Sequence, residues 1–147
     1  MYNPVSTYRL QFNKDFSFAD ARQQIDYLHM LGAGTIYASP VFSATPGSTH
    51  GYDITNPHMV NPEIGTEEEL KKLTKSLKNR RIGWIQDIVP NHMAFNHHNP
   101  WLMDVLEKGK DSEYAGVFDI DRQHTQFRSK LMLPFLGDNP AEVLEQG

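Results

Sequence analysis

The sequence contains no cysteine among its 147 residues. Disulfide bonds, thiolate zinc sites and a cysteine nucleophile are therefore excluded. It also has no apolar run near the roughly 20 residues that a helix needs to span a bilayer. The first residues, Met1–Val5, carry neither the basic nor the apolar segment of a signal peptide. Together these absences predict a cytoplasmic protein without a membrane partner.

Basic residues are too few to suggest a nucleic-acid partner. The chain has 14 Lys and Arg against 18 Asp and Glu, a formal net charge of −4. Phosphate binding needs clustered Lys and Arg. The densest basic run, from Lys71 to Arg81, follows three glutamates on a predicted helix, and we interpret it as a solvated helix face. The sequence therefore predicts no binding to nucleic acid.

Short apolar runs alternate with amphipathic helices through residues 6–92. Strands are predicted at residues 6–11, 35–38 and 82–89. Helices between them begin after Ser17 and Thr66, each with an acidic residue three positions on that completes a capping box. The third strand is apolar almost throughout, as expected of a parallel strand buried on both faces. The order β-α-β-α-β predicts a parallel sheet with right-handed crossovers and its helices on one face.

The pattern changes beyond Asn91, and we place the organisational boundary near Ala94, between residues 1–93 and 94–147. A short helix is predicted at residues 100–107, stopped by Gly109. Two further short strands are predicted at residues 117–121 and 130–133. Residues 41–65, rich in Pro, Gly, Asn and Thr, are expected to form a long connection without regular structure.

The candidate functional residues are those at the carboxyl ends of the predicted strands, because ligands of parallel α/β proteins bind there. The loop after the second strand and the end of the third bring six such residues to one rim: His50, Tyr52, Asp53, Asp87, Asn91 and His92. Gln11, at the end of the first strand, is a further candidate. An aromatic face packs on the C–H face of a sugar ring, while imidazole, amide and carboxylate groups bind its hydroxyls. The rim therefore predicts a carbohydrate site.

Other constellations have simpler explanations. His92, His97 and His98 could suggest a metal site, but their spacing fits no standard zinc pattern, and we predict no metal. Asp119 and Asp121 would face one side of a strand and mimic a catalytic pair, although exposed carboxylates are the favoured interpretation. Similarly, Trp84 is expected in the core. Trp101 is expected to be a packing anchor, with a sugar platform as the alternative.

Two motifs resemble the alpha-amylase superfamily. The run Asp87-Ile-Val-Pro-Asn91-His92 is similar to its signature D-x-x-x-N-H at the end of barrel strand 3, and His50-Gly-Tyr52 is similar to its aromatic segment after strand 2. Longer stretches resemble one group within it, the maltooligosyl trehalose synthases: Thr7–Gln11, Ser39–Pro40, Pro46–Asp53, Asp87–Ala94, Phe118–Asp121 and Leu133–Pro134. These matches follow one another in order along the chain.

The resemblance implies the first part of a (β/α)8 TIM barrel and the start of the insertion domain after strand 3. It also implies a retaining, double-displacement enzyme that turns the reducing-end α-1,4 link of a maltooligosaccharide into an α,α-1,1 link. The nucleophile, the acid/base and a third carboxylate of the superfamily come from strands 4, 5 and 7. No catalytic residue is therefore expected in this chain, which we expect to be inactive without the remainder of the barrel.

The resemblance also implies a role for each rim residue. Tyr52 would stack on the sugar and His92 would bind its hydroxyls, whereas Asp87 would only support catalysis by steadying an arginine of a later strand. His50 and Asp53 would line the site, with Gln11 a weaker candidate. Asn91 occupies the position of a calcium ligand in many amylases, but neither calcium nor another cofactor is expected here.

Two alternatives remain open beside the synthase: a hydrolase of the same superfamily, and a catalytically dead carbohydrate-binding module. Three strands cut from a barrel would leave unpaired edges and an uncovered inner face. Leu10, Ile36, Ile85 and Ile88 are the apolar residues expected on that face. The chain is therefore predicted to form a dimer through its strand edges or to be only marginally stable.

Overall fold

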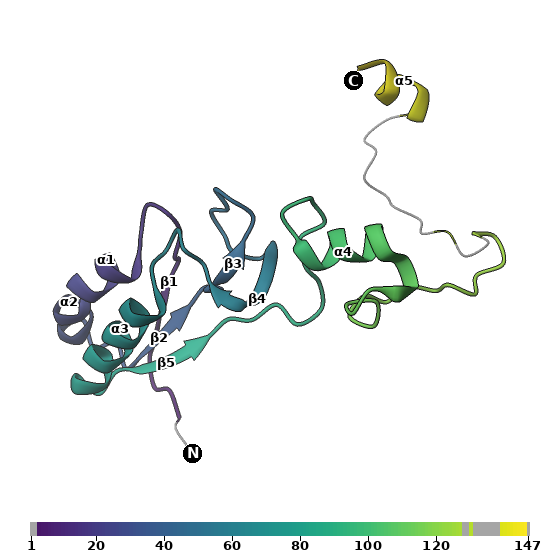
Figure 1. The fold of residues 1–147 in the computed structure, drawn as a ribbon. Coiled ribbons are helices and arrows are strands. Elements are labelled where there is room, and N and C mark those ends of the chain that lie inside the picture. Colours follow the sequence, from purple (N-terminus) through teal and green to yellow (C-terminus); the bar gives the residue numbers. More distant parts are fainter. Residues whose placement is uncertain (1–2, 128–129, 131–138, 147) are drawn as a thin grey trace. The chain divides into compact units, whose positions relative to one another are not determined.

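The computed structural model describes residues 3–127, 130 and 139–146 (Figure 1). It divides into two compact units, Met1–Pro100 and Trp101–Gly147. Whether residues 94–147 are the start of an insertion domain stays a prediction. The strand predicted at residues 130–133 lies outside the described residues except for Lys130, and the Leu133–Pro134 match lies wholly outside them.

A three-stranded parallel sheet forms the centre of the first unit. Its strands are β1 (Thr7–Leu10), β2 (Thr35–Ala38) and β5 (Gly83–Gln86), in the order β1-β2-β5. Each strand pairs with the next one of the β-α-β-α-β series, which confirms the predicted order and direction. Leu10 lies opposite Ala38, and Ala38 opposite Gln86, so all three strands end at the same level.

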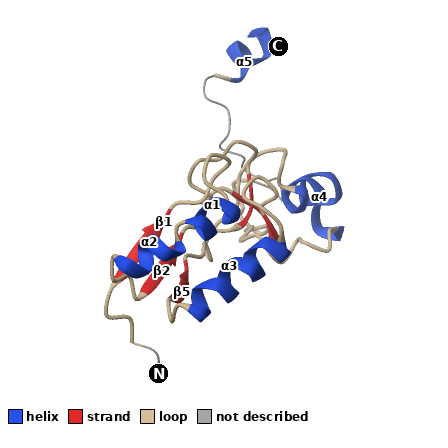
Figure 2. Ribbon diagram, turned by 90° about the vertical axis from the view of Figure 1, so that its left-hand side faces the viewer, coloured by secondary structure: helices blue, strands red, loops and turns tan. Residues whose placement is uncertain are grey.

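Three helices cover one face of this sheet, as predicted: α1 (Phe18–Gln23), α2 (Ile25–Met30) and α3 (Glu67–Asn79) (Figure 2). Both predicted capping boxes are present, Ser17 with Asp20 and Thr66 with Glu69. The single helix predicted after Ser17 is divided at Gln24. The N–H of Gln24 bonds to the carbonyl of Ala21, three residues back, so the chain tightens there into a 3-10-like turn.

The core lies between these helices and the sheet. Its largest fully buried side chains include Phe12, Phe18, Leu28, Ile36, Leu73 and Leu77. The rings of Phe12 and Phe18 meet edge to face at 5.2 Å. Trp84 packs against this cluster, as expected, with its ring 6.1 Å from that of Phe12. The apolar stripes read from the sequence therefore face the sheet.

The other face of the sheet is uncovered among the described residues, which corrects two expectations. The third strand is not buried on both sides, because the side chains of Ile85 and Ile88 are 37% and 59% exposed. Leu10 and Ile36 were expected on the same face, but both are buried in the helix-covered core. Side chains alternate along a strand, so Ile85 lies on the face opposite to Ile36, which the described helices leave uncovered.

Residues 41–65 hold a second sheet that the sequence did not predict. β3 (Phe42–Ala44) and β4 (Ile54–Val60) pair antiparallel, with register shifts on both sides of Ser43. Pro57 inside β4 lacks a backbone donor and is normally read as evidence against a strand. The loop between the strands is closed by the N–H of Thr45, which donates to the carbonyl of Asp53.

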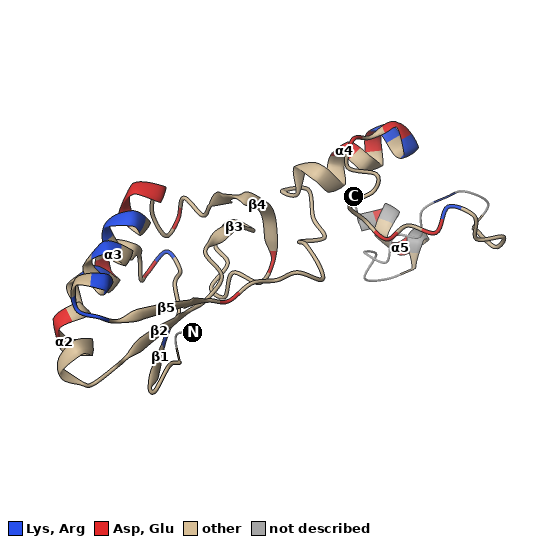
Figure 3. Cartoon of the chain, turned by 90° about the horizontal axis from the view of Figure 1, so that it is seen from below, with Lys and Arg blue, Asp and Glu red and all other residues tan. Residues whose placement is uncertain are grey.

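The basic run on α3 is a solvated helix face, as interpreted from the sequence. Figure 3 shows the acidic first turn of α3 followed by Lys and Arg along its length. Lys71 Nζ lies 2.6 Å from Glu67 Oε1, four residues earlier, and both side chains are about two-thirds exposed, at 67% and 65%. Exposed pairs of this kind give a helix only local support.

The second unit contains α4 (Pro100–Lys108), a short 3-10 helix (Gly109–Asp111) and α5 (Pro140–Gln146). Gly109 adopts a positive φ of 62° and ends α4, as predicted. The rings of Trp101 and Tyr114 stack at 5.0 Å, so Trp101 packs within this unit. The strand predicted at residues 117–121 is wrong: Val117 ends a turn, and no described strand pairs with this segment. In the described part of the chain, no helix has the length and apolarity to cross a membrane.

Gly65 is expected to be the least replaceable glycine of the first unit. Its φ is +135°, and a Cβ there would lie 2.8 Å from Phe18 Cδ2 and 2.9 Å from Glu69 Oε2. We expect Gly65→Ala to lower the free energy of unfolding by about 3 kcal/mol, from backbone strain and the clash together. The matched control is Gly32→Ala, which shares a positive φ but meets open space, and should cost about 1 kcal/mol. Equal losses in urea unfolding would contradict this account.

Candidate functional site

The site lies at the carboxyl ends of the three parallel strands. Gln11, Ser39 and Asp87 follow β1, β2 and β5 at the same level. The N–H of Ser39 donates to the carbonyl of Leu10, and that of Asp87 to the carbonyl of Ala38. These backbone bonds extend the sheet pattern by one residue, so the first residues beyond the strands are held side by side.

Arg9, Tyr52 and Asp87 form the centre of the site. The phenol of Tyr52 donates to Asp87 Oδ2 at 2.7 Å. The guanidinium of Arg9 donates to the same oxygen at 3.3 Å and to the Tyr52 hydroxyl at 3.1 Å. Tyr52 and Asp87, predicted from different strand ends, are thus brought into direct contact. Arg9 was not singled out as a site residue, although it lies within the Thr7–Gln11 match.

Gln11 ties the first strand to the loop that carries Tyr52. Its side-chain amide donates to the carbonyls of Thr49 and His50, at 3.3 and 3.2 Å. Its carbonyl oxygen accepts from Arg9 at 3.1 Å. Both ends of the amide are therefore engaged by protein, and in this structure Gln11 acts as a loop anchor.

The loop itself is held by short-range contacts among its predicted site residues. His50 Nδ1 accepts from the N–H of Tyr52 at 3.0 Å, and the two rings stack with centroids 5.9 Å apart. The hydroxyl of Ser48 donates to Asp53 Oδ1 at 2.5 Å, which His50 Nδ1 approaches to 3.7 Å. Gly51 has a φ of +74°, and a Cβ there would lie 3.0 Å from the carbonyl oxygen of Pro40. The His-Gly-Tyr motif therefore needs its glycine to lie against the end of β2.

Asn91 and His92 follow the same strand end as Asp87 but are not joined to this network. Both side chains are exposed. Within residues 3–127, no hydrogen bond or ion pair connects either of them to Arg9, Tyr52 or Asp87. The structure therefore brings His50, Tyr52, Asp53, Asp87 and Gln11 together, while the roles of Asn91 and His92 stay predictions.

The contacts set the charge state of the site. The hydrogen bond from Tyr52 lowers the pKa of Asp87, with Arg9 and Tyr37 acting in the same direction. The same bond raises the pKa of Tyr52, and Arg9 offsets part of that rise. At neutral pH the site therefore holds a carboxylate, a neutral phenol and a guanidinium. Such a set offers fixed hydrogen-bond donors and acceptors but no group ready to exchange a proton near pH 7.

We expect the free energy of unfolding to decrease at low pH because Asp87 becomes protonated. Its pKa in the folded chain lies below the ordinary value of 3.8, so the carboxylate stabilises the fold above that value. The contribution is lost as the pH falls through the folded-state pKa. The urea midpoint should therefore drop below about pH 4, and drop less in Asp87→Asn, which cannot titrate at this position. Identical pH profiles for the two proteins would contradict this assignment.

No group of three His, Asp or Glu side chains is placed to hold a metal ion in the part of the chain that the structure describes. His97 and His98, part of the metal alternative, lie against each other with ring centroids 3.9 Å apart. Asn91, at the position of a calcium ligand in many amylases, is exposed.

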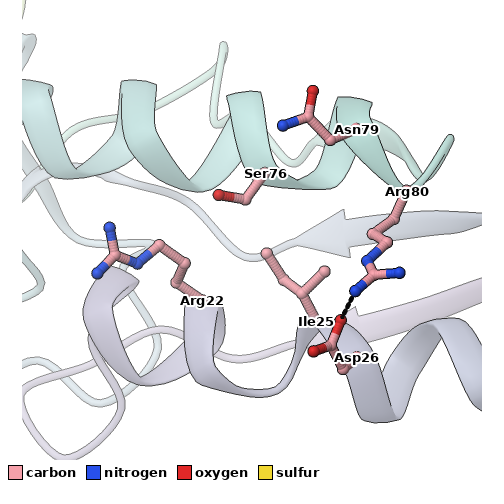
Figure 4. Close-up of a pocket in the computed structure, with 6 residues that line it drawn as sticks. All are labelled: Arg22, Ile25, Asp26, Ser76, Asn79 and Arg80. Carbon is pink, nitrogen blue, oxygen red and sulfur yellow. Dashed lines mark ion pairs between the residues drawn. The ribbon is translucent and has the colours of Figure 1, made fainter.

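A separate groove of about 520 Å³ lies among the helices (Figure 4). It is lined by Arg22, Ile25, Asp26, Ser76, Asn79 and Arg80. Arg80 is paired with Asp26 at 2.5 Å, and the groove shares no residue with the strand-end site. The groove is therefore no part of the site described above.

Comparison with known proteins identifies the family. The model of the alpha-amylase catalytic domain matches residues 20–136. A maltooligosyl trehalose synthase of Mycobacterium tuberculosis is 42% identical over 142 residues, which covers 92% of this chain and 18% of that protein. Alpha-amylase 2 of Dictyoglomus thermophilum is 43% identical over 95 residues, covering 65% of this chain and 16% of that protein.

A solved structure agrees with the fold. The maltooligosyltrehalose synthase from Arthrobacter ramosus superimposes with a TM-score of 0.85 at 43% identity, over 95% of this chain and 18% of that one. The chain therefore spans less than a fifth of the length of these relatives. Its sheet and helices are the first β-α-β-α-β part of a (β/α)8 barrel, and the chain belongs to the alpha-amylase catalytic-domain family.

Proposed function

We propose that this chain is the first part of a barrel enzyme that isomerises maltooligosaccharides. The enzyme would convert the reducing-end α-1,4 link into an α,α-1,1 link and leave a chain that ends in trehalose. The observation that carries the proposal is identity of 42% to a maltooligosyl trehalose synthase over 92% of this chain. The agreement with the Arthrobacter ramosus structure supports the same assignment.

Tyr52 would form one wall of the sugar site. The residue is 37% exposed although its hydroxyl is held by Arg9 and Asp87, and the ring face that does not stack on His50 would meet the sugar. Sugar rings pack their C–H faces on such aromatic surfaces. The exposed imidazole of His92 would bind hydroxyls beside it. Asp87 would act only as a support, because its carboxylate is already engaged by two donors.

The reaction itself would need residues from later barrel strands. A carboxylate attacks the anomeric carbon of the penultimate glucose, and the terminal glucose leaves through its O4, which takes a proton from an acid. The anomeric hydroxyl of the released glucose then attacks the glycosyl–enzyme. It gives its proton to the residue that had protonated O4, which now acts as the base. One glycosidic bond breaks and another forms, so no redox cofactor or co-substrate is consumed. Water must be excluded between the steps, since it would hydrolyse the intermediate.

A hydrolase of the same family is the second candidate, favoured by the 43% identity to alpha-amylase 2 over 95 residues. Its site would use the same rim and differ in admitting water to the glycosyl–enzyme. A catalytically dead sugar-binding module is the third. The DNA sequence after codon 147 distinguishes the module from both enzymes. We expect the reading frame to continue there into the later barrel strands. A stop codon at that point would refute the proposal and favour the module.

A further inference from the structure

Arg9 of β1 contacts rim residues that follow all three parallel strands. Its guanidinium reaches Asp87 at 3.3 Å and the Tyr52 hydroxyl and Gln11 Oε1 at 3.1 Å each. Its Cζ also lies 4.7 Å from the centre of the Tyr37 ring on β2. One side chain of β1 thereby joins the neighbouring strand, the loop after it and the end of β5.

The Tyr52 hydroxyl both donates and accepts a hydrogen bond in this network. A phenol has one proton to donate and lone pairs with which to accept. Here the proton goes to Asp87, and a lone pair accepts from Arg9. With a donor and an acceptor direction both occupied, the hydroxyl is held at a definite point while the residue remains partly exposed. A single hydrogen bond to Asp87 would leave the ring free to pivot about that bond.

The guanidinium also balances the charge of Asp87. The two form an ion pair at 3.3 Å with partly covered side chains, 37% and 16% exposed. Without Arg9, the carboxylate would keep only neutral phenol partners, Tyr52 and Tyr37, at the strand ends. A planar, forked cation can donate to two acceptors and stack on a ring at the same time, which an ammonium group cannot.

We propose that Arg9 is a positioning residue of the rim, which fixes the Tyr52 ring and the Asp87 carboxylate in one orientation for sugar binding. The orienting role stands on the contacts above, whereas its use for a sugar rests on the proposed function. Neither the D-x-x-x-N-H motif nor the His-Gly-Tyr motif includes this position. Strand β1 therefore contributes to the rim through a side chain outside both motifs.

The first test needs no sugar. The phenol of Tyr52 is titrated by carbon NMR of labelled tyrosine in the protein encoded by the complete reading frame, with Tyr52→Phe identifying its signal. Arg9→Gln should shift the pKa of Tyr52 upward, because Arg9 lowers that pKa and Asp87 raises it. Arg9→Lys should shift it less, since the charge is kept. The matched control is Arg22→Gln on α1, an exposed arginine away from the rim, which should leave the titration unchanged.

An unchanged Tyr52 titration in a folded Arg9→Gln protein would overturn the proposal. Circular dichroism of each variant establishes that it is folded. Arg9 is partly exposed, and if Arg9→Gln fails to fold, Arg9→Lys decides in the same way: a titration identical to that of the unmodified chain overturns the proposal, and a smaller upward shift supports it. A merely structural residue would change stability without moving the titration of Tyr52 in this graded order.

The second test uses the enzyme encoded by the complete reading frame, with maltopentaose as substrate. Arg9→Gln should lower kcat/KM by about tenfold, mainly through KM, and Arg9→Lys should recover part of the loss. Arg22→Gln should match the unmodified enzyme. Unchanged kinetics together with a shifted Tyr52 titration would refute the sugar-binding role and leave the orienting role. An enzyme inactive on maltopentaose would refute the proposed function, and the titration would still decide the role of Arg9.

Discussion

The 147-residue chain, purified alone, is expected neither to hydrolyse nor to isomerise maltooligosaccharides. The family's nucleophile and acid/base come from later barrel strands, and the parallel sheet described for this chain contains β1, β2 and β5. Loss of a whole cooperating catalytic set commonly costs on the order of 10⁶-fold in rate. The rim residues are proposed to bind and orient a sugar, but binding alone supplies no group that attacks the anomeric carbon.

The measurement is an incubation of the chain with maltopentaose, followed by chromatography and proton NMR of the products. Recovery of maltopentaose unchanged is the expected result. A Tyr52→Ala chain purified in parallel identifies contaminating enzyme, whose activity would be the same in both samples. Turnover by the unmodified chain that is lost in Tyr52→Ala would contradict the account, because it would place a complete active site within these residues.

The free chain is also expected to self-associate or to be only marginally stable. β1 and β5 are the outer strands of the sheet, so each has one edge that pairs with no described strand. The uncovered face exposes Ile85, and Ile88 just beyond β5 is also exposed, at 37% and 59%. Open edges and apolar faces of this kind favour strand pairing or association between copies. If the chain stays monomeric, we expect a free energy of unfolding below about 5 kcal/mol.

Sedimentation and urea unfolding measure these two outcomes. The matched variant is Ile85→Lys, which places a charge on the uncovered face without touching the helix-covered core. It should shift the chain toward monomer, because a charge there disfavours association. A monodisperse monomer with a cooperative transition and a free energy of unfolding near 10 kcal/mol would contradict the account. It would favour a stand-alone module that needs no further strands.

The parts of the fold that could be predicted are those encoded locally. Ser17 with Asp20, and Thr66 with Glu69, mark helix starts through contacts within four residues. The apolar stripes then give the buried face of each helix, and the β-α-β order gives a parallel sheet. The position of Tyr52 beside Asp87 followed from the same topology, because neighbouring parallel strands end at one edge.

The parts that could not be predicted depend on contacts distant in sequence. Pairing of β3 with β4 tolerates Pro57 and two register shifts, which no local pattern reveals. The burial of Leu10, as opposed to Ile85, depends on which face the helices cover. Arg9 acts on Asp87 across 78 residues, and an arginine on a short strand carries no local sign of such a role. The strand-end rule placed Asn91 and His92 on the rim, but in the described part of the chain neither forms a hydrogen bond or ion pair with Arg9, Tyr52 or Asp87.

The identity of the product most directly tests whether this chain begins a trehalose-forming enzyme. The protein encoded by the complete reading frame is incubated with maltopentaose, and the products are analysed for reducing ends and for the proton NMR signal of an α,α-1,1 link. The account predicts loss of reducing ends without a change in chain length, with trehalose at the former reducing end. Shorter maltooligosaccharides with new reducing ends, and no α,α-1,1 signal, would contradict it and identify a hydrolase.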